Sequence, residues 1–76
     1  MSKEEKVFTI RAYDKAELAE LYSPKRNTAA ALQTLYRWIQ KNITLKEELN
    51  KIGYNKYRHS FLKQEVAVII RHLGEP

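Results

Sequence analysis

No cysteine occurs anywhere in the 76 residues of this chain. The usual supports of very small domains, disulfide bonds and cysteine-bound zinc, are therefore excluded, as are iron–sulfur clusters and thiol nucleophiles. A domain of this size buries only about 60% of its unfolded surface. Hydrophobic residues make up 43% of the chain, which is enough for one core. We therefore expect a single domain that is stabilised by side-chain packing alone or by pairing with a second copy.

The charge of the chain is unevenly distributed. The net charge is +5, but residues 1–20 sum to −1, and residues 21–76, with ten basic and four acidic side chains, sum to +6. Two windows contain no acid, one between Glu20 and Glu47 and one from Lys51 to Gln64. Folded onto one face, these windows would form a positive surface that favours an acidic partner.

The sequence pattern predicts a mainly α fold of four short helices with one short N-terminal β-strand. Residues 7–13 are rich in β-branched and aromatic side chains, which favour a strand. Asp14, followed three residues later by Glu17, is typical of a capping box that opens a helix over 15–22, and Pro24 ends that helix. The predicted inward face of the helix consists of Leu18, Leu21 and Tyr22.

A second helix is expected to begin at Asn27 or Thr28, because either side chain can cap it. Its apolar residues recur at three- and four-residue spacing, which predicts a core-facing stripe of Ala29, Leu32, Leu35, Tyr36 and Ile39. The opposite stripe would be uncharged to basic and would consist of Ala30, Gln33, Thr34, Arg37 and Lys41.

Thr44 and Glu47 repeat the capping-box pattern and open a short third helix, which Gly53 would end in a left-handed conformation. Its predicted inward residues are Leu45, Leu49 and Ile52. Residues 54–59 have no clear period, so we expect a loop or a turn. A last helix over about 60–73 would bury Leu62, Val66, Ile69, Ile70 and Leu73. Residues 1–6 are expected to be a flexible N-terminus before a single helical domain over 7–76.

Five consecutive apolar residues, 66–70, cover more than one stripe of the last helix. One small core could hardly cover them, which predicts a symmetric homodimer with the strand at 7–13 pairing across its interface. The predicted interface residues are Val66, Val68, Ile69 and Ile70. The alternative is a core helix within one chain that leaves only Val68 exposed.

Catalysis is not expected. The only histidines, His59 and His72, have no spacing typical of a metal pair or of a nucleophile and its base, and the isolated Gly53 and Gly74 are better explained as helix ends. We therefore predict no enzyme activity, no cofactor and no metal. The longest apolar run has five residues and no signal-peptide pattern is visible, which predicts a cytoplasmic protein without a membrane partner.

Two segments are similar to helix-turn-helix motifs, which place one helix in the DNA major groove and brace it with another. The first contains Glu-Leu-Ala-Glu-Leu-Tyr over 17–22 and Leu-Tyr-Arg-Trp-Ile over 35–39, and these phrases resemble small regulators of the MerR and excisionase type. Its turn, 23–27, is longer than usual and has Ser23-Pro24 in place of glycine. The residues predicted to face nucleic acid are Lys25, Arg26, Gln33, Thr34, Arg37 and Lys41. The basic side chains would bind phosphates, and Gln33 or Thr34 would contact base edges.

The second candidate motif runs over 45–53 and continues into a helix predicted to start near Lys56. The side chains at the start of that helix would be Lys56, Tyr57, Arg58, His59 and Lys63. His59 departs from the motif, which normally buries an aliphatic side chain there. Alternatively, residues 54–59 form a wing loop that reaches phosphate or the minor groove.

The overlap of the acid-free windows with both motifs favours a small nucleic-acid-binding module, a DNA-binding regulator or accessory protein with duplex DNA as its partner. The alternative is an adaptor module that binds an acidic protein. The aromatic side chains of Tyr36, Trp38 and Tyr54 are expected in the core, because they share a face or a turn with aliphatic residues.

Several phrases together span residues 8–76: Glu17-Leu-Ala-x-Leu-Tyr22, Arg37-Trp-Ile39, Gly53-Tyr-Asn-Lys56, Phe61-Leu-Lys63 and Leu73-Gly-Glu-Pro76. In this combination the chain resembles a family of small uncharacterised proteins of Bacteroides-type gut bacteria, a domain of unknown function. The resemblance implies one domain and no specific activity. It also implies a place among bacterial regulatory or mobile-element proteins.

Overall fold

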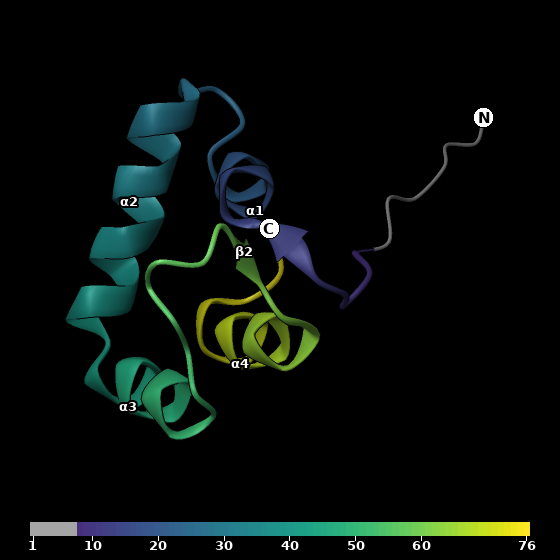
Figure 1. Cartoon of the computed structure of the whole chain (residues 1–76). Coiled ribbons are helices and arrows are strands. Elements are labelled where there is room, and N and C mark those ends of the chain that lie inside the picture. Colours follow the sequence, from purple (N-terminus) through teal and green to yellow (C-terminus); the bar gives the residue numbers. More distant parts are fainter. Residues whose placement is uncertain (1–7) are drawn as a thin grey trace.

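The computed structural model describes residues 8–76 of the chain (Figure 1). Its elements, in chain order, are β1 (Tyr13–Asp14), α1 (Lys15–Tyr22), α2 (Thr28–Lys41), α3 (Ile43–Lys51), β2 (Ser60–Phe61) and α4 (Lys63–Leu73). The predicted mainly α fold with four helices is confirmed. The predicted flexible N-terminus, residues 1–6, lies outside the described residues, as does the first residue of the predicted strand.

The strand predicted over 7–13 is wrong in its bounds and in its partner. Only Tyr13 and Asp14 form a strand, and residues 8–12 are irregular. β1 pairs antiparallel with β2 of the same chain, so its backbone hydrogen bonds do not require a strand from a second copy of the chain. The aromatic residues serve packing, because the ring of Phe8 stacks on that of Tyr13 with centroids 5.4 Å apart.

Helix α1 has the predicted bounds, but its capping differs from the prediction. Asp14 occupies the N-cap position without a side-chain capping bond, and the Glu17 carboxylate instead pairs with the Arg11 guanidinium at 3.0 Å. Leu18 is buried as predicted, whereas Leu21 is 43% exposed. At 100° per residue the buried stripe is centred between Leu18 and Ala19, which places Leu21 outside it.

Helix α2 begins after Asn27, whose Oδ1 accepts a hydrogen bond from the Ala30 amide at 2.8 Å, as predicted. The residues it buries are Ala31, Leu35 and Ile39. The core-facing stripe is thus rotated toward Ala31 relative to the prediction. As a result Ala29 is exposed and Tyr36 is 54% exposed, so the expectation that Tyr36 belongs to the core is wrong.

Helix α3 begins two residues earlier than the predicted capping box. Asn42 is the N-cap, and its Oδ1 accepts from the Leu45 amide at 3.1 Å, so Thr44 lies inside the helix. The predicted stop at Gly53 is confirmed, with a φ of +85°. The Tyr54 amide donates to the Leu49 carbonyl at 3.0 Å and the Gly53 amide to the Asn50 carbonyl at 3.1 Å, which is the Schellman arrangement. Leu45 and Leu49 are buried as predicted, whereas Ile52 is 38% exposed because it follows the last helical residue.

The helix predicted to start near Lys56 is absent, because residues 54–59 form a loop and Ser60–Phe61 form β2. The second helix-turn-helix candidate is therefore wrong. The fully buried carboxylate of Glu65 holds this loop, since it accepts from the Leu62 amide at 2.8 Å and lies 2.5 Å from the Arg58 guanidinium. Because Phe61 pairs with Tyr13 and packs in the core, α4 begins only at Lys63.

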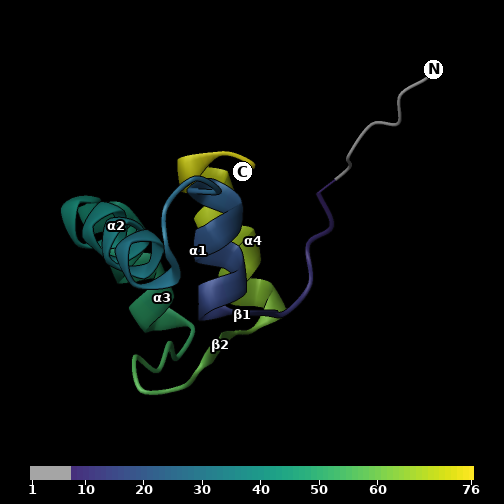
Figure 2. The same ribbon diagram turned by 90° about the horizontal axis from the view of Figure 1, so that it is seen from above.

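Helix α4 packs against α3 and runs alongside α1 (Figures 1 and 2). Val66, Val68 and Ile69 are buried within the chain, and Ile70 packs against the same core. The inference that one core could not cover this helix is wrong. The alternative, a core helix within one chain, is confirmed except for Val68, which is only 7% exposed. The homodimer stays a prediction, but burial of residues 66–70 no longer supports it. None of the helices among residues 8–76 has the length and hydropathy needed to cross a bilayer.

Candidate nucleic-acid interface

Helices α1 and α2 form a crossed pair. In Figure 1 α1 is seen end-on while α2 runs lengthwise, and in Figure 2 the two views are exchanged. Beyond the buried Ala19 and Ala31, the contact is extended by Tyr22, whose ring meets that of Trp38 edge to face with centroids 5.8 Å apart. The Thr28 hydroxyl donates to the Glu20 carboxylate across the connection. The two helices of the first predicted motif thus lie in contact and cross each other.

The outward surface of α2 carries Gln33, Arg37 and Lys41, all exposed, and we call this the outer face of α2. Lys25 and Arg26 are also exposed, in the connection that leads into α2. Thr34 differs from the prediction, because it is only partly exposed and its hydroxyl donates to the Ala30 carbonyl at 2.9 Å. The hydroxyl proton of Thr34 is thus used within α2, whereas the Gln33 side chain forms no hydrogen bond among residues 8–76.

The ion pairs among residues 8–76 do not neutralise the positive charge of the outer face of α2. Four pairs are present: Arg11–Glu17, Arg58–Glu65, Arg71–Glu48 and His72–Glu48. None of them uses a cation of α2 or of the connection before it. Because α2 itself contains no acid, the outer face of α2 keeps its positive charge.

The basic residues of the second acid-free window, 51–64, do not all lie beside the outer face of α2. Arg58 is committed to Glu65 and to the Ser60 carbonyl, which lies 3.1 Å from its Nε. Lys63 is exposed in the first turn of α4, and Tyr57 is 80% exposed at the tip of the loop. Lys56 is the member of this window that reaches toward α2, where it borders a hollow.

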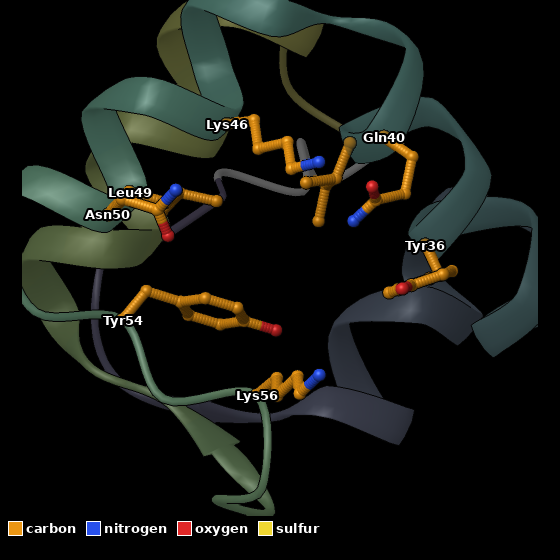
Figure 3. Close-up of a pocket in the computed structure, with 8 residues that line it drawn as sticks. Tyr36, Gln40, Lys46, Leu49, Asn50, Tyr54 and Lys56 are labelled. Atoms are coloured by element: carbon orange, nitrogen blue, oxygen red, sulfur yellow. The ribbon is translucent and has the colours of Figure 1, made fainter.

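That hollow lies between α2, α3 and the loop, and its volume is about 250 Å³ (Figure 3). Its lining consists of Tyr36, Ile39, Gln40, Lys46, Leu49, Asn50, Tyr54 and Lys56. Only Lys56 belongs to the predicted site residues. Burial raises the pKa of Tyr54, so its phenol stays protonated and can donate a hydrogen bond at neutral pH.

Lys15 is a further residue that the pattern analysis missed. Its ammonium donates to the carbonyls of Asn55 and Lys56, at 3.3 and 3.1 Å, and lies 4.7 Å from the centre of the Tyr54 ring. Burial, reinforced by the Arg58 charge, lowers the pKa of Lys15. These hydrogen bonds from Lys15 hold the loop against the start of α1 and thereby position Tyr54 and Lys56.

No group of side chains in the described part of the chain has the composition and proximity of a metal site. His59 is exposed in the loop, and the Nε2 of His72 lies 2.5 Å from a carboxylate oxygen of Glu48. The second histidine is thus part of an α3–α4 contact.

A comparison with protein families finds one match, the family described as a domain of unknown function, DUF4248, over residues 9–76. No curated protein and no solved structure matches the chain. The matched range begins within the irregular segment before β1 and includes all four helices.

Proposed function

The chain belongs to the DUF4248 family, and we propose that it is a small nucleic-acid-binding module that presents α2 to duplex DNA. The observation that carries the proposal is the outer face of α2, which is exposed, contains no acid and forms no ion pair with any described residue. We propose that the protein performs this role in the cytoplasm.

The dimensions and side chains of α2 suit this role. Its 14 residues extend about 21 Å, and the major groove, about 12 Å wide, admits a helix. Arg37 and Lys41 would bind phosphates, while the Gln33 amide can offer a donor and an acceptor to a base edge. Lys25 and Arg26 stand just before the N-terminus of α2, where free backbone amides favour phosphate.

The second candidate is an acidic protein partner. It is favoured by exposed aromatic side chains near cations, because aromatic residues and arginine are enriched at protein interfaces. Tyr36, Trp38 and Tyr57 are 54%, 39% and 80% exposed, respectively. The two candidates differ in whether purified duplex DNA alone is bound.

Fluorescence anisotropy with a labelled duplex, measured across a series of salt concentrations, tests the proposal. We expect binding that weakens steeply with salt, because each phosphate neutralised contributes about 0.9 to the logarithmic slope. Arg37→Gln and Lys41→Gln should each lower the affinity and reduce the slope by about one. Arg11→Gln is the control and should bind as the wild type does, since Arg11 is already paired with Glu17.

Two results would overturn the proposal. One is the absence of binding at low salt up to about 10⁻⁴ M protein, where even non-specific binding occurs. The other is binding that Arg37→Gln and Lys41→Gln leave unchanged. Capture of an acidic protein by nuclease-treated chain, with no duplex binding, would establish the second candidate instead.

A further inference from the structure

The hollow beside α2 continues into a second one. The second hollow, of about 200 Å³, shares Tyr36, Ile39, Tyr54 and Lys56 with the first and extends toward Lys15 and Phe61. We call the two together the tyrosine–lysine groove. The first hollow alone, at about 250 Å³, is close to the size at which small-molecule sites begin, roughly 300 Å³. The groove runs along the side of α2 rather than over its outer face.

The floor of the tyrosine–lysine groove is apolar, and its walls are aromatic. Leu35, Ile39 and Leu49 are buried beneath it. The Tyr54 ring forms one wall and stacks near-parallel with Phe61, with centroids 6.0 Å apart, and Tyr36 forms the opposite side (Figure 3). Figure 3 shows the two tyrosine rings side by side across the space, so a planar ring bound there would pack one of its faces against Tyr54.

Apart from Lys15, the polar side chains of the groove lack hydrogen-bond partners within the described residues, and the Lys56 ammonium lies 5.3 Å from the centre of the Tyr57 ring. Figure 3 shows the polar ends of Gln40, Lys46, Tyr54 and Lys56 around one common space. None of these side chains forms a hydrogen bond or ion pair among residues 8–76, and no carboxylate lines either hollow. Two uncompensated ammonium groups on a partly apolar site favour a bound anion.

The chemistry of this lining selects a class of ligand. Two lysines suit a phosphate, which accepts several charge-assisted hydrogen bonds. The amides of Gln40 and Asn50 each offer both donors and an acceptor, as the edge of a nucleobase requires. We propose that the tyrosine–lysine groove binds a nucleotide, with the base packed against Tyr54 and the phosphate at Lys46 and Lys56.

The site is held in place before any ligand arrives. Lys15 ties the carbonyls of Asn55 and Lys56 to α1, and the Schellman turn at Gly53 sets the direction in which Tyr54 leaves α3. Such preorganisation lowers the entropy cost of binding. The proposal goes beyond the contact with duplex DNA, because a nucleotide here would occupy a surface that the outer face of α2 does not use.

Isothermal titration calorimetry of the whole chain with adenosine monophosphate, adenosine and inorganic phosphate tests the site. Adenosine monophosphate should bind at least about tenfold more tightly than either fragment, because it alone engages both the aromatic walls and the lysines. Lys46→Gln should weaken it about tenfold, and Tyr54→Leu should do so through lost stacking. Lys51→Gln is the matched control, an exposed lysine of the same charge outside the groove, and should leave nucleotide affinity unchanged.

Because Lys46 is exposed, Lys46→Gln is expected to fold, and its thermal unfolding curve should overlay that of the wild type. A 5′-phosphorylated tetranucleotide forms the second arm of the test. If it outcompetes adenosine monophosphate, the source of the nucleotide is a single strand, and if it does not, the source is the free nucleotide. Either result supports the groove.

The proposal is overturned if adenosine monophosphate binds no more tightly than phosphate, or if Lys46→Gln and Tyr54→Leu bind it as the wild type does. Arg37→Gln separates this failure from that of the duplex proposal. That variant should lose duplex affinity and keep nucleotide affinity, since Arg37 lines neither hollow.

Discussion

At the scale of single residues, the fully buried Glu65 links two segments of the chain. One oxygen accepts from the Leu62 amide at the start of α4, and the other pairs with Arg58 in the loop. A buried carboxylate is tolerated only when it is paired and hydrogen-bonded, and both conditions are met here. Glu65 therefore couples the first turn of α4 to the loop that carries Tyr54 and Lys56.

Glu65→Gln should lower the free energy of unfolding by about 2 kcal/mol, because it replaces hydrogen bonds to a charged group by neutral ones and leaves Arg58 without its carboxylate. Urea unfolding followed by circular dichroism measures the change. Glu17→Gln is the control, since its pair with Arg11 is half-exposed, and it should cost less than about 1 kcal/mol. Equal losses in the two variants would contradict the organising role of Glu65.

The contact of Glu48 with α4 should make stability depend on pH. The hydrogen bond from His72, together with the nearby Arg71 guanidinium, holds the pKa of Glu48 below its usual 4.5. A carboxyl with a lowered folded-state pKa stabilises the fold above its usual pKa and loses this contribution as the pH falls through the lowered value. The stability difference between wild type and Glu48→Gln should therefore be steady down to about pH 5 and shrink below about pH 4. A difference that grows with acidification would contradict this assignment.

At the scale of elements, capping residues determine where the helices begin and end. Asn27, Asn42 and Gly53 each form local bonds that need no tertiary contact. For this reason the start of α2 and the end of α3 can be predicted from the sequence, whereas the pattern favours Thr44 and overlooks Asn42 as the cap of α3. The start of α4 cannot, because it depends on pairing of Ser60–Phe61 with Tyr13–Asp14, which lie far away in the chain.

Gly53→Ala tests the end of α3. The glycine has a φ of +85°, and an added Cβ would meet no atom within 4 Å, so the substitution introduces backbone strain without a steric clash. We expect a loss of about 1–2 kcal/mol in the free energy of unfolding, measured by urea titration. Gly53→Asn should cost less, because asparagine tolerates the left-handed region better. An alanine variant as stable as the wild type would refute this account of the turn.

Helix α4 distinguishes a core within one chain from a dimer interface. Ile69 is fully buried, so Ile69→Ala should lower the free energy of unfolding by about 2–5 kcal/mol. The unfolding midpoint should not depend on protein concentration, in contrast to an obligate dimer. A midpoint that rises with concentration in the wild type and no longer does so in the variant would instead place Ile69 in a dimer interface.

At the scale of the whole molecule, the uneven distribution of charge predicted from the sequence is also present in the structure. The described ion pairs gather on the N-terminal segment, the loop and α4, while α2 keeps its cations unpaired. Helical periodicity placed Gln33, Arg37 and Lys41 on one face correctly. It could not place Lys63 or Arg58, because their positions depend on β2 and on the buried Glu65.

The tyrosine–lysine groove could not be predicted, because it exists only once α3 and the loop face α2. Tyr36 and Gln40 are one turn apart on α2, and Lys46 and Asn50 are one turn apart on α3, which is the only local signal. Each pair alone is common on solvated helices. The pattern placed Tyr36 in the core, an error that follows from the rotation of the α2 stripe toward Ala31.

The central claim is that the outer face of α2 contacts DNA. Chemical-shift mapping of the ¹⁵N-labelled chain, titrated with a short duplex at low salt, tests it most directly. We expect the largest chemical-shift changes in the backbone amides of residues 25–41, centred on Gln33 and Arg37. The amides around Lys63 and Arg71 should keep their shifts. Changes centred on α4, or a spectrum that the duplex leaves unaltered, would contradict it.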